Sequence, residues 1–292
     1  MLWLLAQQTL NGLIMGLVYA LLALGLTISF GIGRVINFAH GELYMLGAFL
    51  TYLAANQVGY LGGIALAVLA MAVAGLLLDR LVLRPLRLGN QGSLWAPFLA
   101  TLAVSLIVQN AALAVFGPDP YLLSSPFAYQ PLVVAGLTLT KQDILIALVA
   151  GLTTFLLTAF IKRGKYGMAM RAVARDRQTA ALMGINIDRI YILTFVLSAV
   201  LAGLAGALVA PKATVDPFIG RMALLKGLSV VILGGLGNIP GAIYGGLILG
   251  ITEALGAGFV SAAYKDAIGY ALMILVLLFR PEGLLGRQMR RA

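Results

Sequence analysis

The chain has 292 residues, of which 61% are hydrophobic and only 10% are charged. Soluble domains usually carry about 25% charged residues, so a water-soluble fold of this size has too little polar surface to cover its apolar side chains. The formal charge of +10 arises from 20 basic and 10 acidic residues. The basic residues gather in short stretches between apolar segments, which indicates one side of a membrane rather than a nucleic-acid partner. The composition therefore predicts an all-α protein that crosses a lipid bilayer several times.

Metal and thiol chemistry is not expected from this sequence. It contains no cysteine, which excludes disulfides, thiolate metal sites and cysteine nucleophiles. His40 is the only histidine and stands in no His-Glu-x-x-His motif, so the sequence predicts no metal site. A membrane-embedded enzyme would show a nucleophile–base or metal set, and no such pattern is present.

Apolar segments long enough to cross a bilayer follow one another along the chain. A transmembrane helix needs about 20 mostly apolar residues. The segment 224–256 is too long for one straight helix, which would extend about 50 Å against a hydrocarbon core of about 30 Å. We therefore expect it to turn back on itself. The candidate segments are 6–30, 36–56, 61–78, 94–116, 143–161, 191–210, 224–256 in two parts, and 264–279.

Glycine and proline interrupt two of these segments. The stretch 234–241 reads Gly-Gly-Leu-Gly-Asn-Ile-Pro-Gly, which is poor helix material. We expect one polytopic domain over residues 1–292, with about eight or nine membrane-embedded helices that include broken or re-entrant segments. The expected helix breaks are Gly31, Gly33, Gly235, Gly237 and Pro240.

A shift of 204 positions brings two parts of the sequence into register. Gly31-Ile32-Gly33 then falls on Gly235-Leu236-Gly237. The apolar segments that follow also end alike, in Leu83-Arg84-Pro85 and in Phe279-Arg280-Pro281. Both Arg-Pro pairs lie on the same side in the expected topology, which predicts a parallel internal repeat. Corresponding breaks in two repeats indicate a transport pathway.

Lysine and arginine predict the orientation of the chain in the membrane. The loop 162–190 carries seven basic residues against two acidic ones and should therefore be cytoplasmic. Placing the other basic clusters on the same side puts the loop 117–142 and the N-terminus outside. These clusters are Arg80, Arg84 and Arg87, and then Arg280, Arg287, Arg290 and Arg291.

The basic loop also contains a segment with helix-forming character, 168–183, and Gly184 follows it as a helix stop. A short helix held on the cytoplasmic side can dock into a groove on a soluble partner. The alternative is a solvated, positively charged loop.

Four polar side chains in or beside apolar segments are candidate site residues. Asn37, His40 and Glu42 are candidates for the translocation pathway or its gate, because intramembrane ionisable groups usually have a role. The alternative is that they bond to backbone groups freed by the Gly31–Gly33 break. Glu253 shares a helix face with small residues, so it should face protein or a water-filled cavity. Pathway lining and a structural hydrogen bond both remain open for it.

No energy source is encoded in the chain. There is no G-x-x-x-x-G-K-[ST] loop, so ATP-driven transport would need another chain to hydrolyse ATP. A secondary transporter would need ionisable residues along its spans, and we count mainly Glu42 and Glu253.

One run of residues resembles a known family. Residues 36–48, Ile-Asn-Phe-Ala-His-Gly-Glu-Leu-Tyr-Met-Leu-Gly-Ala, are similar to the signature of LivH-type permeases, the membrane subunits of bacterial branched-chain amino acid ABC importers. The stretches 171–186, 234–241 and 279–283 are also similar to that family. The resemblance implies a permease for branched-chain or other hydrophobic, neutral amino acids. Urea and short-amide permeases carry a related first motif and remain the alternative.

The resemblance also implies partners. They are a second, homologous permease in a heterodimer, two cytoplasmic ATPases that use ATP and Mg²⁺, and a periplasmic binding protein; this chain itself would bind no cofactor. It further implies that 168–184 is a coupling helix, because Thr179-Ala180-Ala181 with Gly184 is similar to the Glu-Ala-Ala…Gly element of ABC permeases. The glutamate is absent here, and the glycine comes one position early. The candidate coupling residues are Arg171, Arg175, Ala180, Ala181 and Gly184.

Overall fold

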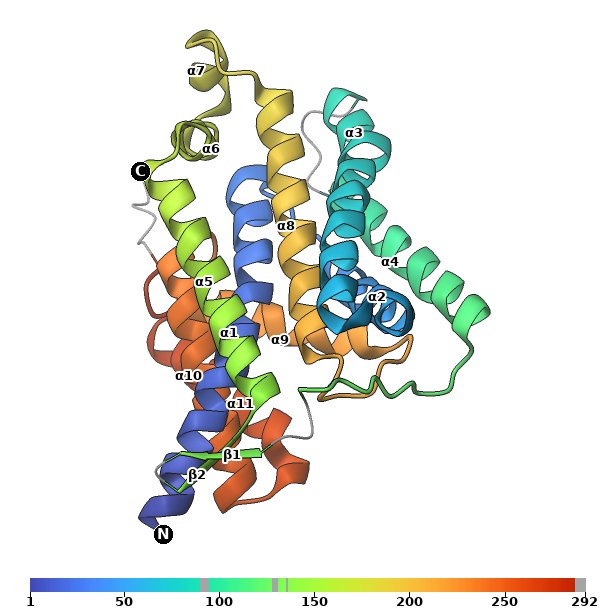
Figure 1. Ribbon diagram of the computed structural model, residues 1–292. Coiled ribbons are helices and arrows are strands. Elements are labelled where there is room, and N and C mark those ends of the chain that lie inside the picture. The colour runs from blue at the N-terminus through green and yellow to red at the C-terminus, as the bar shows by residue number, and fades with distance from the viewer. Residues whose placement is uncertain (90–94, 128–130, 135, 287–292) are drawn as a thin grey trace.

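The computed structural model describes residues 1–89, 95–127, 131–134 and 136–286. Helices dominate this part of the chain; α1, α5 and α8 run along the length of the molecule, α4 is inclined to them, and α6 lies across one end (Figure 1). In chain order the elements are α1 Leu2–Gly33, α2 His40–Leu77, the π-helix η1 Leu78–Leu83, α3 Arg84–Gly89, α4 Trp95–Phe116, β1 Pro131–Val134, β2 Leu137–Thr140, α5 Lys141–Arg163, α6 Lys165–Arg175, α7 Arg177–Leu182, α8 Ile187–Val209, α9 Ile219–Gly234, α10 Ile239–Phe259, the 3₁₀ helix η2 Ala262–Tyr264 and α11 Lys265–Phe279.

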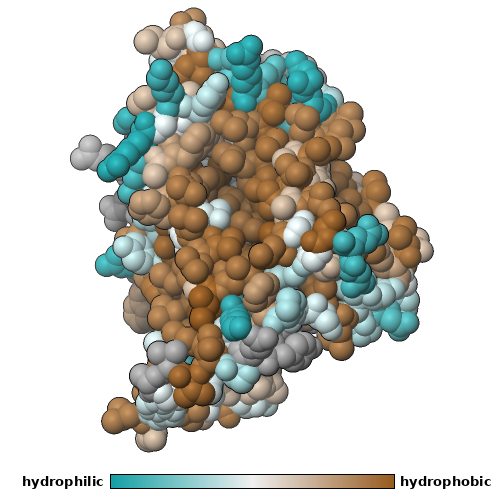
Figure 2. Space-filling view, viewed as in Figure 1, coloured by the Kyte–Doolittle hydropathy of each residue, from teal (hydrophilic) through white to brown (hydrophobic). Residues whose placement is uncertain are grey.

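Seven helices within the described ranges are long and apolar enough to cross a membrane. Apolar side chains cover the middle of the molecule, and hydrophilic ones gather at the end that carries α3, α6 and α7 (Figure 2). The chain is therefore a polytopic, all-α membrane protein. The larger count expected from sequence treats the two parts of α2 separately and includes α9, which is apolar but only 16 residues long.

The long helix α2 is bent back on itself at Gly59. This residue has φ 74° and ψ 166°, a conformation open to glycine because it lacks a Cβ. A Cβ placed on Gly63 would lie only 3.0 Å from the carbonyl oxygen of Thr51. Residues so far apart along a straight helix would be separated by about 18 Å. The predicted segments 36–56 and 61–78 are thus two arms of one bent element.

Glycines allow the central helices to pack backbone against backbone. A Cβ on Gly250 of α10 would lie 2.5 Å from the carbonyl oxygen of Gly12 in α1, and one on Gly246 would lie 2.6 Å from the nitrogen of Ala20. Small residues permit this close approach where lipid supplies no hydrophobic drive between helices. Helix α1, buried over most of its length, is the centre of the fold.

The turn after α1 lies slightly beyond the glycines that we expected to break it. Gly31 and Gly33 are still helical and form the last turn of α1. Arg34 follows with φ 53°, the only positive φ of a non-glycine residue in the described ranges. The chain therefore leaves the helix at Arg34, whose left-handed backbone ends the hydrogen-bonded spiral.

In the second turn the glycines themselves make the reversal. Gly235 and Gly237 have φ values of 103° and 76°, between the end of α9 and the start of α10. Asn238 caps α10 by accepting a hydrogen bond from the backbone N–H of Gly241, and Pro240 stands in the first turn, where proline is tolerated. A Cβ on Gly31 would lie 3.8 Å from Gly237 Cα, so the two turns meet.

The segment 168–183 forms two helices, which corrects the single helix expected from sequence. Asp176 separates α6 from α7 with an extended backbone, φ −152° and ψ 110°. Its carboxylate accepts hydrogen bonds from the backbone N–H groups of Gln178 and Thr179. Asp176 is therefore an N-cap that starts a new helix, and this local bonding overrides the helical pattern around it. Gly184 follows α7 with φ 81°.

The end of the molecule opposite α6 and α7 contains a small antiparallel hairpin, β1–β2, which we did not expect within the loop 117–142 (Figure 1). Tyr121 in the same loop forms a β-bridge with Val215. Thr140 and Asp143 then make a capping box that starts α5. The other end of the molecule carries α3, α6 and α7, which contain residues of two of the predicted basic clusters. Three residues of the third cluster, Arg287, Arg290 and Arg291, lie outside the described residues.

Candidate translocation site and coupling segment

His40 lies at the centre of a neutral polar cluster between α1, α2 and α8. The ring is fully buried, and its Nε2 lies 3.0 Å from the carbonyl oxygen of Leu22. A carbonyl can only accept, so Nε2 carries the proton and Nδ1 is left as an acceptor. The hydroxyl of Ser198, 3.2 Å away, donates to Nδ1. Both ring nitrogens are thus satisfied, as a buried neutral imidazole requires.

Asn37 and Glu42 point to other partners. The Asn37 side chain accepts a hydrogen bond from the backbone N–H of Ala39 at 3.1 Å, at the entry to α2. Glu42 accepts from the hydroxyl of Ser105 on α4 at 3.0 Å, while its other oxygen is buried without a partner among the described residues. That second oxygen lies beside Gly220, near the start of α9. The predicted group of three is therefore spread over three different neighbours.

A charged cluster joins α1, α9, α10 and α11. Glu253 is fully buried and is bonded to Lys226 Nζ, while the hydroxyl of Tyr19 donates to its other oxygen at 2.8 Å. Lys226 also pairs with Asp266 at 2.8 Å, and Lys265 lies 3.9 Å from Glu253. Glu253 thus faces protein, and the ammonium of Lys226 lies between the carboxylates of Glu253 and Asp266 and pairs with both.

A cavity of about 330 Å³ opens beside this charged cluster. Lys226 and two carboxylates, Asp216 and Asp266, line it together with Tyr19 and Tyr44. Most of the remaining wall is apolar and comes from Met15, Val18, Leu22, Val209, Phe218, Ile219, Met222 and Ala223. An apolar wall with a few convergent polar groups is the usual composition of a small-molecule site.

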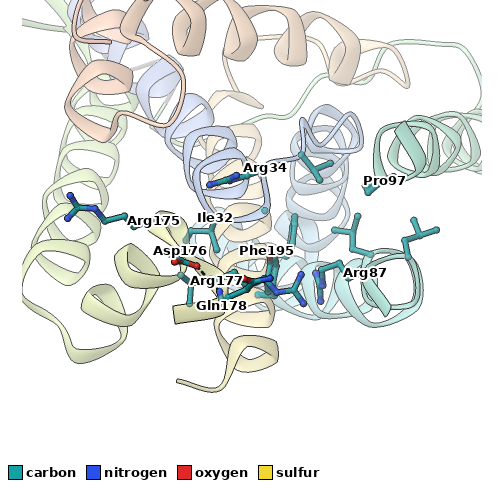
Figure 3. A pocket seen from close by; sticks show the side chains of 15 residues that line it. Ile32, Arg34, Arg87, Pro97, Arg175, Asp176, Arg177, Gln178 and Phe195 are labelled. Carbon is teal, nitrogen blue, oxygen red and sulfur yellow. Dashed lines mark hydrogen bonds between the residues drawn. The ribbon is translucent and has the colours of Figure 1, made fainter. Parts of the chain in front are cut away.

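A second cavity, of about 490 Å³, lies where α1, α3, α6, α7 and α8 meet (Figure 3). Its charged lining consists of Arg34, Arg87, Arg175 and Arg177 with one carboxylate, Asp176. The hydroxyl and the backbone N–H of Thr179 hold the pKa of the Asp176 carboxyl below its ordinary value. The excess of positive charge suits acidic groups of a partner.

One arginine of this second cavity is fixed in place. Arg87 pairs with the buried Asp79 at 2.7 Å, and its guanidinium lies 4.1 Å above the ring of Tyr191. Arg177 approaches the same ring at 5.6 Å, so Figure 3 shows the two arginines close together. An aromatic face attracts guanidinium groups, so Tyr191 offsets part of the repulsion between these two cations.

The predicted coupling residues lie on different surfaces of α6 and α7. Ala180 is buried, whereas Ala181 and Gly184 are exposed. The exposed tip also carries two large apolar side chains, Leu182 and Met183, which are 88% and 78% exposed. Apolar side chains held in water at a helix end are typical of a docking surface.

The two predicted coupling arginines on α6 are exposed. Arg171 donates to the carbonyl oxygen of Ile161, which ties α6 to the end of α5. Arg175 lines the second cavity.

Comparison with known proteins settles the family. The family model described as branched-chain amino acid transport system / permease component matches residues 8–277. The chain belongs to this permease family. It is 38% identical to the high-affinity branched-chain amino acid transport system permease protein BraD of Pseudomonas aeruginosa, over 96% of this chain and 95% of the relative. The LivH protein of Escherichia coli K12 has the same identity and coverage, and a probable LivH of Methanocaldococcus jannaschii is 31% identical over 91% and 88%.

The family and the seven apolar helices make this permease a multi-pass protein of the inner membrane, and a transport component rather than an enzyme. Among the residues described, no three histidine, aspartate or glutamate side chains gather to hold a metal ion.

Sequence reasoning overlooked the cationic partner of Glu253 in the permease. Lys226 is an isolated lysine within an apolar stretch, and Asp266 begins the last apolar helix. Intramembrane ionisable residues are expensive and should each be assigned a partner. Applying that rule to Lys226 as well as to Glu253 would have indicated the pair.

Proposed function

We propose that this permease is a transmembrane subunit of an ATP-driven ABC importer that moves branched-chain or other hydrophobic, neutral amino acids into the cytoplasm. The observation that carries the proposal is similarity over nearly the whole chain to permeases named for high-affinity branched-chain amino acid transport. The largely apolar cavity beside Lys226 supports it, because such a wall suits an aliphatic side chain.

The proposed assembly contains four kinds of subunit. Besides this chain, it has a second, homologous permease that forms a heterodimer with it, two cytoplasmic ATPases that use ATP and Mg²⁺, and a periplasmic binding protein that delivers substrate. The chain binds no cofactor itself. The lack of a phosphate-binding G-x-x-x-x-G-K-[ST] loop supports ATP hydrolysis by other subunits.

We further propose that the pathway follows the cavity beside Lys226. Glu253 holds this lysine in place from behind, while Asn37, His40 and Glu42 support the gate at the start of α2. The contact between Gly31 and Gly237 supports a gate in which the turns of the two repeats move together.

Residues 162–190 form the cytoplasmic coupling loop of this single permease domain in our proposal. The arginine-rich lining of the second cavity and the exposed Leu182 and Met183 support the docking of an ATPase there. A short helix packed in a groove transmits a displacement that a loose loop would absorb.

The function is tested by uptake into vesicles that contain the reconstituted complex. We expect radiolabelled leucine uptake to need ATP and to be reduced by competing isoleucine and valine, while urea has no effect. Uptake of urea, with no competition from the three amino acids, would replace this proposal with a short-amide permease.

The coupling role is tested with Gly184→Trp, which adds bulk at the exposed end of α7. We expect an inserted, folded permease that either loses the ATPases on co-purification or hydrolyses ATP without uptake. Arg175→Ala is the milder comparison, because exposed ion pairs contribute only about 0–1 kcal/mol. Unchanged assembly and uptake with Gly184→Trp would remove α7 from the coupling path.

Orientation is tested with Arg175→Cys in this cysteine-free chain. We expect no labelling by an impermeant thiol reagent in intact spheroplasts and full labelling after lysis. Labelling in intact spheroplasts would place the coupling loop outside.

A further inference from the structure

We propose that Lys226 and Asp266 form a site inside the membrane that recognises the zwitterionic end of an amino acid, with the carboxylate of the substrate on Lys226 and its ammonium on Asp266. This inference rests on the proposed function and deepens it, since it assigns substrate recognition to the permease as well as to the binding protein.

The position of the pair relative to the cavity is the first observation. Lys226 and Asp266 both line the cavity of about 330 Å³, and their charged atoms are 2.8 Å apart. Small-molecule sites are typically about 300–1,000 Å³, so this cavity is of the size that a single amino acid needs. The pair is therefore placed where a solute in the cavity would touch both charges.

The bonding capacity of Lys226 is the second observation. An ammonium group has three N–H donors. Among the described residues, Glu253 and Asp266 are the carboxylates paired with Lys226. The ammonium also lies 5.1 Å from the centroid of the Tyr270 ring, a weaker contact than an ion pair. The third donor can therefore turn to the carboxylate of a substrate in the cavity.

The asymmetry between the two carboxylates assigns their roles. The Glu253 side chain is 1% exposed and is further held by Tyr19, so it serves as the fixed counter-charge of Lys226. The Asp266 side chain is 44% exposed and lines the cavity, so it can accept from a second cation without losing Lys226. A substrate ammonium is such a cation. Each charge of the substrate would then lie beside a charge of opposite sign, its carboxylate beside Lys226 and its ammonium beside Asp266.

The physical cost of the cluster also points to a ligand. A buried ion pair is seldom more stabilising than apolar residues of similar volume. Apolar side chains at these positions would therefore stabilise the packing of the helices as well as the ion pair does. Exposing the pair to a cavity instead makes it available to a solute that carries both charges.

Apart from a second carboxylate, Asp216, the rest of the wall fits the other end of such a substrate. Met15, Val18 and Leu22 on α1 face the cavity, and Met222 on α9 adds a flexible thioether. Methionine adapts its shape to different apolar partners. The site would therefore require the ammonium and the carboxylate of the substrate and would accept several different aliphatic side chains.

The test measures binding to the permease–ATPase complex in nanodiscs, without the binding protein. The probes are L-leucine, 4-methylpentanoate, which lacks the ammonium, and 3-methylbutylamine, which lacks the carboxylate. We expect saturable leucine binding by calorimetry, with each analogue at least tenfold weaker. Equal binding of leucine and 4-methylpentanoate, or no leucine binding, would overturn the site.

Two variants separate recognition from folding. Asp266→Asn removes the half-exposed charge, and we expect a tenfold or greater rise in the Kd for leucine with little change for 4-methylpentanoate. The double variant Lys226→Met/Glu253→Gln removes the buried pair together. We expect it to fold and assemble but to lose leucine binding, whereas a purely structural pair would leave binding intact. If the double variant does not assemble, the Kd of Asp266→Asn for leucine is the deciding measurement for the recognition site.

Asp119→Asn is the control for removing an exposed carboxylate, and we expect its Kd for leucine to equal that of the unaltered complex. Uptake by the full complex with its binding protein separates the two proposals. Absent leucine uptake by the unaltered complex contradicts the proposed function. Normal leucine uptake by Asp266→Asn and by the double variant contradicts the recognition site alone.

Discussion

Two buried polar clusters hold the centre of this permease together, and they differ in charge and in what lies beside them. The neutral cluster joins His40 to Leu22 and Ser198, so it ties α2 to α1 and α8. The charged cluster joins Lys226 to Glu253 and Asp266, so it ties α9 to α10 and α11.

The neutral cluster is closed and complete. His40 and Ser198 are 0% and 1% exposed, and the ring has a partner on each nitrogen. A neutral group that is fully hydrogen-bonded can be buried at little expense. His40 thus fits a structural brace better than a group that meets substrate.

The charged cluster borders a cavity instead, through Lys226 and Asp266. Burying ions is far more expensive than burying an imidazole, because each ion loses its hydration. The neutral cluster at His40 is therefore suited to packing, whereas the charged cluster at Lys226 is suited to binding.

The largest expected effect is on the charged cluster. Lys226→Met alone leaves Glu253 buried without its main cation, and we expect the free energy of unfolding to fall by about 3–5 kcal/mol. The measurement is the denaturation midpoint in detergent, with Lys226→Met/Glu253→Gln as the matched control. If the single variant is as stable as the double one, Glu253 does not need Lys226, and the difference between the clusters disappears.

A steric change breaks the neutral cluster. A Cβ on Gly25 would lie 2.5 Å from Cε1 of His40, so Gly25→Ala must displace the ring. Overpacking of this kind typically costs about 1–3 kcal/mol. Gly151→Ala is the control, because a Cβ there meets nothing within 4 Å. Equal stability of the two variants, measured by the same denaturation midpoint, would mean that the ring moves freely.

The smallest effect is the loss of one hydrogen bond. Ser198→Ala removes the donor to His40 Nδ1, and we expect a loss of about 1 kcal/mol. Because this cluster does not meet substrate in our proposal, the Kd for leucine should stay unchanged while stability falls. A weaker leucine affinity with unaltered stability would move His40 from the brace to the pathway.

Several features of the fold follow directly from the sequence. Apolar stretches predict where helices cross, because a backbone in lipid must satisfy its own hydrogen bonds. The stretch around Gly235 and Gly237 predicts a reversal, since 224–256 is too long to cross once. The break after α1 was predicted a little early, because Arg34 takes the left-handed conformation that sequence reasoning reserves for glycine.

The candidate site was less predictable for a geometric reason. Lys226 and Glu253 are 27 residues apart, and His40 and Ser198 are 158 apart. Such pairs depend on how each helix is rotated about its axis, which a run of uniformly apolar residues does not specify. Asp176 was also not predicted as an N-cap. It lies within a sequence pattern typical of a continuous helix, and only the extended backbone of the structure shows that a new helix starts there.

By itself, the sequence determined the membrane environment, the helical class, the reversal at Gly235 and Gly237, and the basic clusters from which we predict the orientation. Hydropathy, backbone hydrogen bonding and charge act on each segment separately, so they can be evaluated without knowing its neighbours. Only the tertiary structure decided that His40 is a satisfied neutral group, that Glu253 has a cation, and that Lys226 and Asp266 open onto a cavity. Those properties arise between helices, where close packing through glycines sets which side chains can meet.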